Sequence, residues 1–551
     1  MLRYTGLLAL AALGTAYAQT PKLGIKPPRL VLLVSIDQFR ADYTERFTPY
    51  YLPAKSGSKV GGFRYLMETG ARYLDAHHNH IPTATGPGHA TLMTGSEPAL
   101  DGIIGNNWFD KVAGKGIYCV DDASVKVVGG GSSKPMSPKN LKVTTVGDEL
   151  KMATGGRSRV VGISFKDRAA ILMAGHAADT VFWLDGKTGG WVSSSFYYPN
   201  GSLPSWLQEL NARQLPDTQK SHVWEPLLPN EAYALTRKNP EEASTSTTRP
   251  FSHALGSEKN FVSAFTTSDA GQNYLFQTVT TAIDAEKLGQ HDVPDVLVMN
   301  LATNDYVGHR FGPNSPEVMD IAIRTDRLLS DLFNHLNDKV GLNNVDIVVT
   351  ADHGVLPVPE ESGSEYRTSS IRYPEPAAKA IEAQLVKKFG EGKWLLGDGL
   401  YEQNLFLNHE TAKTKGVSIR DLETAAQDAA MNVPGVYVAF TRTQILHGEV
   451  PHWAWTDKVI NGFHPSLGGD VMVLEAPGAL FDSGTGTSHG SAWAYDSHVP
   501  LLLHGPGIQA GTYGRSVATA DIASTICHLL GVEYPTGNLG TPLREALATK
   551  N

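Results

Sequence analysis

Three short apolar runs, each followed by acidic or imidazole side chains, restrict what this sequence can fold into more than any other feature. The runs span residues 30–36, 293–300 and 345–350. The side chains that follow them are Asp37, Asp305, Asp352 and His353. Unbroken aliphatic and β-branched runs are typical of strands covered on both faces, as in a parallel sheet, and such sheets bind ligands beyond the carboxyl ends of their strands. The sequence therefore predicts an α/β fold with a functional site at one sheet edge, although any single strand-end Asp would more often be a helix N-cap.

Two long segments interrupt this pattern, at roughly residues 180–290 and 356–480. We interpret both as insertions or caps on one large catalytic domain that spans residues 19–551. Residues 317–336 carry apolar side chains at helical spacing, which predicts a helix packed on the sheet.

The N-terminal segment has the pattern of a signal peptide rather than of a structural element. Arg3 precedes an apolar run at residues 7–13, and residues 16–18 (Ala-Tyr-Ala) fit a small-x-small cleavage site. The apolar run is too short to span a bilayer, and no later run is long enough. We therefore expect residues 1–18 to be removed and the protein to be exported, periplasmic or secreted, without a membrane span. An uncleaved N-terminal anchor is the alternative.

Composition excludes a disordered chain, a coiled coil and a collagen. The 551 residues carry a formal net charge of −9, are 41% hydrophobic and have a mean hydropathy of −0.20, which is typical of a soluble globular chain. The acidic balance argues against binding of a nucleic-acid polymer, which needs a basic face. Two cysteines, Cys119 and Cys527, are too few for a disulfide framework, and the sequence leaves their pairing open. No stripe of residues indicates an oligomeric state.

Thr85 lies in the segment that is richest in candidate chemistry. Gly86, Pro87 and Gly88 follow it, and a helix-competent stretch begins at His89. A hydroxyl at this turn would sit at a helix N-terminus, where free N–H groups and the helix dipole favour an alkoxide or a phosphate. A plain N-cap is the structural alternative. The neighbouring histidines are expected to pack or hydrogen-bond rather than to bind metal; they are His77, His78, His80 and His89.

Oxygen and nitrogen donors recur at spacings that suit metal binding. Asp305 and His309 are four residues apart, so one helical turn would put both on the same face. An adjacent Asp-His pair stands at a strand end, and another histidine lies in a glycine-flanked loop. The set is Asp37, Asp305, His309, Asp352, His353 and His489. Donors without sulfur suit zinc at a catalytic site, with manganese or iron as alternatives, and two ions would polarise both oxygens of an in-line displacement.

These residues stand in motifs that follow one another along the chain. The motifs are Ser35-Ile36-Asp37, residues 82–89 (PTATGPGH), residues 102–106 (GIIGN), Lys166-Asp167-Arg168, residues 305–309 (DYVGH), residues 350–354 (TADHG), Ser488-His489-Gly490 and residues 499–502 (VPLL). In this order the sequence resembles the alkaline phosphatase superfamily, and within it the phosphate-irrepressible bacterial alkaline phosphatases that use a threonine nucleophile. The resemblance implies a three-layer α/β/α sandwich with a mostly parallel central sheet and inserted cap segments.

The resemblance also implies two zinc ions and roles for the residues around them. One ion would be held by Asp305, His309 and His489, and the other by Asp37, Asp352 and His353. Thr85 would coordinate the second zinc as its alkoxide and attack phosphorus, giving a covalent phosphothreonine that water on the first zinc hydrolyses. The first zinc would also stabilise the leaving alkoxide, so no protein general acid is required.

Three further residues bear on the substrate class. Lys166 and Arg168 are two residues apart, so in an extended segment both would project to one side and neutralise the oxygens of a phosphate dianion. Asn106 would donate to a third oxygen. A monoester dianion gains more from this clamp than a diester monoanion does, so we expect small-molecule phosphate monoesters as substrates. Without the resemblance, the Lys-Asp-Arg sequence would more simply be a solvated charge cluster.

Three other functions compete with this prediction. A phosphodiesterase or nucleotide pyrophosphatase of the same superfamily shares the metal ligands and the threonine but typically lacks the cationic clamp. An arylsulfatase needs a cysteine in a C-x-P-x-R motif, which neither Cys119 nor Cys527 provides. A binding protein that kept the fold without catalysis would lack a ligand or the nucleophile, and neither is missing here.

Overall fold

The computed structural model describes residues 27–234, 236, 250–361 and 370–548, and the signal peptide predicted at residues 1–18 lies outside them. Within the described residues, ten strands form a central sheet. Their order is β22 (Gly511–Ala518), β4 (Ala71–His77), β21 (His498–His504), β14 (Val345–Thr350), β1 (Leu30–Ser35), β13 (Asp295–Asn300), β8 (Val160–Ile163), β9 (Thr180–Leu184), β10 (Trp191–Ser194) and β7 (Val127–Val128). Only β21 and β10 run against the direction of the others, so the sheet is mostly parallel.

The three predicted apolar runs lie side by side in the middle of this sheet. β1 pairs in parallel with β13 on one side and with β14 on the other. Ser35 at the end of β1 is opposite Asn300 of β13 and Thr350 of β14, so the three strands end at the same level. Every residue of the three strands is buried, as predicted for strands covered on both faces. The register therefore brings the residues that follow these strands to one edge of the sheet.

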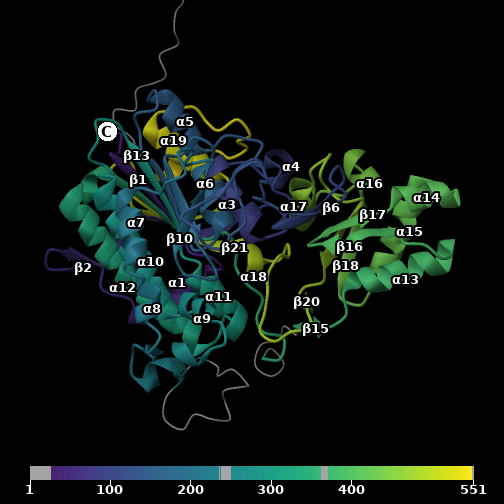
Figure 1. Cartoon of the computed structure of the whole chain (residues 1–551), viewed down its shortest axis with the longest axis horizontal. Helices are drawn as coiled ribbons and strands as arrows, with labels where there is room; N and C mark the ends of the chain where they lie inside the picture. The colour runs from purple at the N-terminus through teal and green to yellow at the C-terminus, as the bar shows by residue number, and fades with distance from the viewer. Residues whose placement is uncertain (1–26, 235, 237–249, 362–369, 549–551) are drawn as a thin grey trace, which may run out of the picture.

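Helices cover both faces of the sheet, which gives the predicted α/β/α sandwich (Figure 1). One layer contains α3 (Thr85–Thr94), α5 (Val146–Ala153), α6 (Asp167–Ala174) and α19 (Asp521–Leu530), and the other contains α9 (Phe261–Thr266), α10 (Asp269–Ala285), α11 (Thr303–Phe311) and α12 (Pro316–Lys339). The helix predicted at residues 317–336 is α12. It begins after Ser315, whose hydroxyl accepts a hydrogen bond from the Val318 N–H, and Pro316 occupies its first turn.

The segment expected as a first insertion, residues 180–290, extends the main domain in the part that the structure describes. Its first two strands, β9 and β10, belong to the central sheet, and α10 belongs to a helix layer. Phe182, Trp183 and Trp191 are buried in the same core as β1 and β13. These large aromatic side chains fill the space beside the sheet, so this segment does not form a core of its own.

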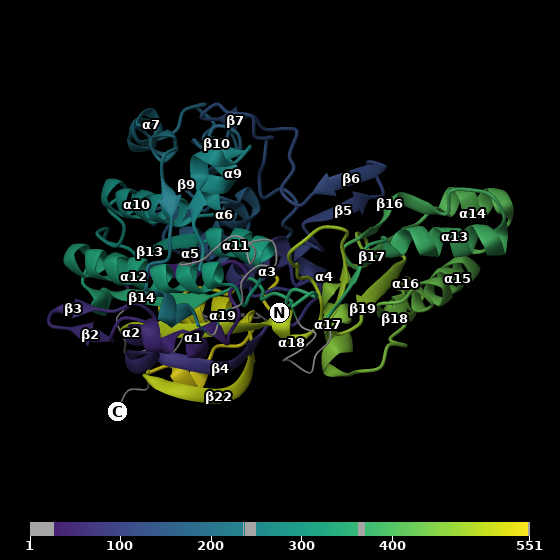
Figure 2. The same cartoon turned by 90° about the horizontal axis from the view of Figure 1, so that it is seen from below.

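Residues 377–475, within the second expected insertion, form a lobe with its own sheet and core, which we call the cap lobe. Its antiparallel sheet has the order β16 (Leu395–Tyr401), β17 (Asn404–Leu407), β19 (Val471–Glu475) and β18 (Val436–Thr441). Its helices are α13 (Ala377–Phe389), α14 (His409–Lys415), α15 (Ile419–Met431), α16 (Arg442–Leu446) and α17 (Ala454–Gly462). Trp394, Leu405 and Leu422 lie in its core. Both views show the cap lobe, in green, extending away from the central sheet (Figures 1 and 2).

Shorter elements connect these parts. In the main domain they are α1 (Tyr43–Arg46), α2 (Phe63–Thr69), α4 (Pro98–Asp101), α7 (Ser205–Ala212), α8 (Leu215–Thr218), α18 (Ala494–Ser497) and the hairpin of β5 (Asn107–Asp110) and β6 (Lys115–Tyr118). Cys119 and Cys527 are buried free thiols and do not form a disulfide with each other. In the part of the chain that the structure describes, no helix is long and apolar enough to cross a membrane.

Candidate active site

The carboxyl ends of β1, β13 and β14 carry a first group of predicted metal ligands. Asp37 follows β1, Asp352 and His353 follow β14, and all three are fully buried. One ligand atom from each lies within 4.8 Å of the others. Asn300, the last residue of β13, donates from Nδ2 to Asp37 Oδ2 at 3.1 Å. Within the described residues, Asp352 Oδ2 and His353 Nε2 are buried without a hydrogen bond, as expected of atoms that hold a metal ion.

A second ligand group adjoins the first. Asp305 and His309 lie one turn apart in α11, as predicted, with His309 Nε2 3.1 Å from Asp305 Oδ1. His489 reaches the same carboxylate from its loop, with Nε2 3.8 Å from Asp305 Oδ1. Ligand atoms of Asp305, His353 and His489 lie within 4.8 Å of one another, so His353 stands between the two groups and His309 flanks the second.

The three ligand histidines share one tautomer. The Nδ1 atoms of His309, His489 and His353 each lie 2.7–2.9 Å from a backbone carbonyl oxygen. A carbonyl oxygen only accepts hydrogen bonds, so each Nδ1 carries the proton and donates it. In its neutral form each imidazole therefore keeps a lone pair on Nε2, and it is this atom that faces the carboxylates, which is the arrangement that a metal-binding imidazole needs.

Burial and neighbouring charges shift the pKa values of these groups. Burial lowers the pKa of His353 and of His489 well below the usual range, which favours the neutral imidazole that a metal ligand requires. Burial also opposes charge on His309, but the Asp305 carboxylate outweighs it and raises the pKa of His309. For Asp352, burial and the nearby Asp37 carboxylate together raise the pKa well above its usual range. The site is thus rich in negative charge that cations would stabilise.

Gln38 ties the two ligand groups together and was not foreseen from the sequence. Its backbone N–H donates to Asp352 Oδ1 at 3.1 Å, and its side-chain amide donates to Asp305 Oδ1 at 2.8 Å. Gln38 has a φ of +63°, a left-handed conformation that costs a non-glycine residue roughly 1–2 kcal/mol. Gly308 allows the close approach, because a Cβ there would lie 1.8 Å from Gln38 Oε1. The role of Gln38 comes from its backbone conformation, which no sequence motif marks.

Thr85 stands beside these ligands as the first residue of α3, so the helix expected from His89 begins four residues earlier than predicted. Ala84 is the N-cap of that helix, and the Thr85 hydroxyl makes no capping hydrogen bond, which removes the plain N-cap alternative. Instead, Thr85 Oγ1 accepts hydrogen bonds from Arg168 Nη2 at 3.1 Å and from Lys166 Nζ at 3.4 Å. The side chain is buried at the N-terminus of a ten-residue helix, where partial positive charge favours an oxyanion.

Lys166 and Arg168 converge on Thr85 from the first turn of α6, not from the extended segment that the two-residue spacing suggested. Lys166 is the N-cap of α6, and Arg168 is its second residue. Lys166 Nζ also lies 2.9 Å from Asp37 Oδ1 and 2.6 Å from Asp305 Oδ2, so one buried ammonium bridges both ligand groups. Burial opposes its charge, but the two carboxylates outweigh burial and raise the pKa of Lys166.

Asn106, the third predicted phosphate-binding residue, contacts the residue that follows Thr85. Its Oδ1 accepts a hydrogen bond from the N–H of Gly86, the residue after Thr85, at 2.7 Å. The β5–β6 hairpin begins directly after Asn106 and ends at Tyr118. The Tyr118 hydroxyl accepts from Arg168 Nη1 at 3.0 Å, so this hairpin links Asn106 to Arg168. Tyr118 was also not foreseen, because nothing near it in the sequence connects a hairpin tyrosine to the Lys-Asp-Arg motif.

These side chains lie at one end of a cleft of about 1130 Å³ between the main domain and the cap lobe. The main domain contributes Thr85, Asn106, Arg168, Asp305 and His309 to its lining, together with the loop that carries His489. The cap lobe contributes part of α13 and the β16–β17 hairpin. The structure therefore brings all the predicted site residues to one place and adds a wall that the sequence did not specify.

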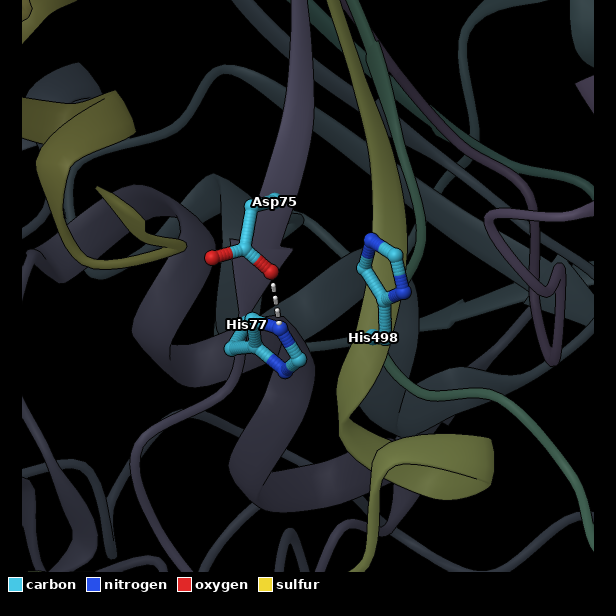
Figure 3. Close-up of side chains that lie close together, drawn as sticks. All are labelled: Asp75, His77 and His498. Atoms are coloured by element: carbon cyan, nitrogen blue, oxygen red, sulfur yellow. Dashed lines mark hydrogen bonds and ion pairs between the residues drawn. The ribbon is translucent and has the colours of Figure 1, made fainter. Parts of the chain in front are cut away.

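The histidines near Thr85 hydrogen-bond, as expected. His78, His80 and His89 are fully buried and bonded within the core. His77 belongs to a partly exposed cluster with Asp75 and His498 (Figure 3). There His77 Nε2 lies 2.8 Å from Asp75 Oδ1, and His498 Nε2 donates to the Leu74 carbonyl at 2.9 Å. The two rings stack at 17°, so their in-plane lone pairs do not converge, and we assign no metal to this cluster.

Comparison with known proteins agrees with this arrangement. The family model described as type I phosphodiesterase / nucleotide pyrophosphatase matches residues 31–382. The chain belongs to this family. Among members similar to it, alkaline phosphatase PafA of Elizabethkingia meningoseptica is 34% identical over 94% of both chains, and alkaline phosphatase PhoV of Synechococcus elongatus is 34% identical over 98% of both.

Solved structures show that this family member also shares its fold with a bacterial alkaline phosphatase. The crystal structure of PafA matches with a TM-score of 0.87 at 32% identity, over 95% of this chain and all of that one. A second PafA structure, with a TM-score of 0.86, carries substitutions of a threonine, an asparagine, a lysine and an arginine. The predicted fold, the resemblance to bacterial alkaline phosphatases and the prediction of an enzyme of that kind are confirmed by these matches.

Proposed function

We propose that this protein hydrolyses small phosphate monoesters through a covalent phosphothreonine on Thr85, with two zinc ions as cofactors. The observation that carries the proposal is the convergence of Lys166 and Arg168 on Thr85 Oγ1, at 3.4 and 3.1 Å, beside two adjoining groups of metal ligands. A hydroxyl nucleophile, cations for the phosphate oxygens and a metal site are the parts that such a reaction uses. The names of PafA and PhoV as alkaline phosphatases support this assignment.

The donor set fits zinc. It consists of three carboxylates and three imidazoles that each offer Nε2, without sulfur. Asp37, Asp352 and His353 would hold one ion, and Asp305, His309 and His489 the other. Bound zinc supplies Lewis-acid stabilisation of negative charge on oxygen. The Lys166 ammonium shares the oxygens of Asp37 and Asp305 with any metal ion, so metal binding would free Lys166 for the substrate.

The remaining chemistry belongs to the chain itself. Thr85 Oγ1 attacks phosphorus, so that a bond from Oγ1 to phosphorus forms and the bond from phosphorus to the ester oxygen breaks, releasing the alcohol. Water then attacks the phosphothreonine, inorganic phosphate leaves and the Thr85 hydroxyl is restored. The N-terminus of α3 stabilises negative charge in both steps. Arg168, whose guanidinium donates to both Tyr118 and Thr85, would donate to the oxygens of the phosphate that Thr85 attacks.

The cationic pair favours a monoester over a diester. Lys166 and Arg168 bring two positive charges to one hydroxyl, and a dianion gains more from them than a monoanion. In the substituted PafA structure the threonine and asparagine are 21 residues apart and the lysine and arginine two apart, which are the spacings of Thr85 to Asn106 and of Lys166 to Arg168. This correspondence supports a joint role for the four residues. The bulk charge of −9 therefore says little about a pocket in which Lys166, Arg168 and bound metal dications would outweigh the buried carboxylates.

A phosphodiesterase or nucleotide pyrophosphatase is the second candidate, and the description of the family favours it. The two functions share a nucleophile and metal ligands, so the charge carried by the substrate separates them. We further propose that residues 1–18 direct export, which would place the enzyme in a periplasm or outside the cell.

A comparison of an aryl phosphate monoester with the matching diester tests the proposal. We expect kcat/KM of the wild-type enzyme to be far higher for the monoester. Lys166→Ala and Arg168→Ala should each lower the monoester value by about 100-fold and the diester value by less than about 10-fold, because a charge-assisted contact contributes more to a dianion. Arg157→Ala removes an exposed arginine that is paired with Asp292, and it serves as the matched control with unchanged kinetics. A wild-type preference for the diester would support the second candidate instead.

A further inference from the structure

Glu402 reaches from the cap lobe to the phosphate-binding residues of the main domain. It stands in the two-residue turn between β16 and β17, where Tyr401 pairs with Asn404. Its Oε1 accepts the backbone N–H of Asn106 at 2.7 Å and that of Asn107 at 3.4 Å. Glu402 also lines the cleft that contains Thr85 and Arg168. One carboxylate of the cap lobe thus holds the loop that carries Asn106.

The backbone of Glu402 is strained in the position that makes this contact. Its φ is +51°, in the left-handed region that residues other than glycine and asparagine rarely adopt. Such strain persists only where the surrounding structure enforces it, and it gathers at functional sites. The fit is also close, because a Cβ on Gly105 would lie 3.0 Å from Glu402 Oε2. A glycine at residue 402 would suit the turn better, so the side chain has a role that the turn itself does not explain.

The contact bears on two of the three phosphate-binding side chains. Asn106 is held to the start of α3 by its hydrogen bond from the Gly86 N–H. Asn107, the second residue that Glu402 contacts, is paired across the β5–β6 hairpin with Tyr118. Tyr118 accepts from Arg168, whose guanidinium in turn donates to Thr85. A shift of the Asn106–Asn107 backbone would therefore move both the Asn106 amide and the support of Arg168.

We infer that Glu402 is a positioning residue, through which the cap lobe fixes Asn106 and Arg168 around Thr85. This inference rests on the proposed function and deepens it, because it assigns to the cap lobe a part in phosphate binding. Glu402 acts through the Asn106 and Asn107 N–H groups, which need an acceptor oxygen and not a negative charge. The carboxyl-to-carboxamide change Glu402→Gln keeps such an oxygen, whereas Glu402→Gly removes it and relieves the backbone strain.

Kinetics of an aryl phosphate monoester test this role. We expect Glu402→Gly to lower kcat/KM by about 10- to 30-fold and to weaken inhibition by inorganic phosphate, without lowering the melting temperature. Glu402→Gln should stay within about 3-fold of the wild type. In an Asn106→Ala/Arg168→Ala background, Glu402→Gly should cost no more than about 3-fold, because its effect passes through these two side chains. Glu410→Ala, which removes an exposed acid of α14 in the same lobe but outside the cleft lining, is the matched control and should leave the kinetics unchanged.

Each outcome decides for or against the inference. Equal losses in Glu402→Gln and Glu402→Gly would mean that charge matters and not the acceptor, and would overturn it. A full loss on top of Asn106→Ala/Arg168→Ala would show that Glu402 acts through neither side chain, and this result would also overturn the inference. Wild-type enzyme without monoesterase activity would instead contradict the proposed function, and inorganic phosphate binding by the same variants would then still test the positioning role.

Discussion

The main domain and the cap lobe differ in the type of their sheet and in what they contribute to the site. In the main domain, parallel strands β1, β13 and β14 end at the same level, and all the predicted metal ligands and Thr85 come from elements around that edge. The cap lobe has an antiparallel sheet with a separate core, and it contributes a cleft wall and the Glu402 contact. The proposed reacting groups thus stand at the ends of fully buried strands, whereas the cap lobe, which has a core of its own and a smaller cluster shared with the main domain, contributes to access and fine positioning.

The largest expected effect follows from replacing Thr85, the proposed nucleophile of the main domain. Thr85→Ala should lower phosphatase kcat by at least about a thousandfold and abolish the covalent phosphoprotein, since no other hydroxyl is held by both Lys166 and Arg168 within the described residues. Rapid acid quench with a radiolabelled monoester measures the intermediate. Thr85→Ser keeps a hydroxyl and is the control. A cap-lobe variant with an equally large loss would break the division of labour between the two regions.

Metal removal should be the next largest effect, and it should be confined to the main domain. Chelation should abolish activity, and zinc should restore it, because Asp37, Asp305 and Asp352 would otherwise leave negative charge buried together. Saturating metal at a thousand times Kd stabilises by about 4 kcal/mol. Hydrogen exchange should therefore rise after chelation in the loops that follow β1 and β14, but not in residues 377–475. Full activity of verified metal-free enzyme would exclude the two-zinc proposal.

A matched pair of core substitutions compares the stability of the two regions. Leu422→Ala in α15 and Leu332→Ala in α12 each remove a buried side chain, and each should cost about 2–5 kcal/mol. Because the cores are separate, Leu422→Ala should raise hydrogen exchange only in residues 377–475, and Leu332→Ala only in the main domain. Destabilisation of both regions by either variant would show that the lobes unfold as one cooperative unit.

The smallest expected effect concerns Asp346, which lies near the start of β14. Asp346, at the far end from Asp352, is buried, and its carboxylate oxygens have no hydrogen bond within the described residues. Burial raises its pKa to about 7, so its protonated form is favoured in the folded state, and its ionisation lowers stability as pH rises from about 4 through 7. Asp346→Asn should therefore stabilise the protein by about 1–3 kcal/mol at pH 8.5 and by much less at pH 4, with activity unchanged. Urea unfolding at both pH values measures this, and a gain independent of pH would contradict it.

Much of the site follows from patterns within single elements. The predicted runs are β1, β13 and β14, the Asp305 and His309 pair lies on one face of α11, and Thr85 begins α3. Each of these features depends on the periodicity of one strand or helix, or on a turn next to it. The expectation that Lys166 and Arg168 project to one side was right, but the local structure assumed for it was wrong. The two residues lie at the start of α6 and not in an extended segment.

The sequence by itself determined which residues we propose as carrying the chemistry, because their types and spacings can be recognised within short stretches of chain. Tertiary structure alone decided that residues 180–194 join the central sheet while residues 377–475 form the cap lobe. It also decided that Gln38, Tyr118 and Glu402 support the site. Their contacts join elements that are tens to hundreds of residues apart, so they depend on strand register, backbone conformation and the packing of one lobe against another. No local pattern encodes those quantities.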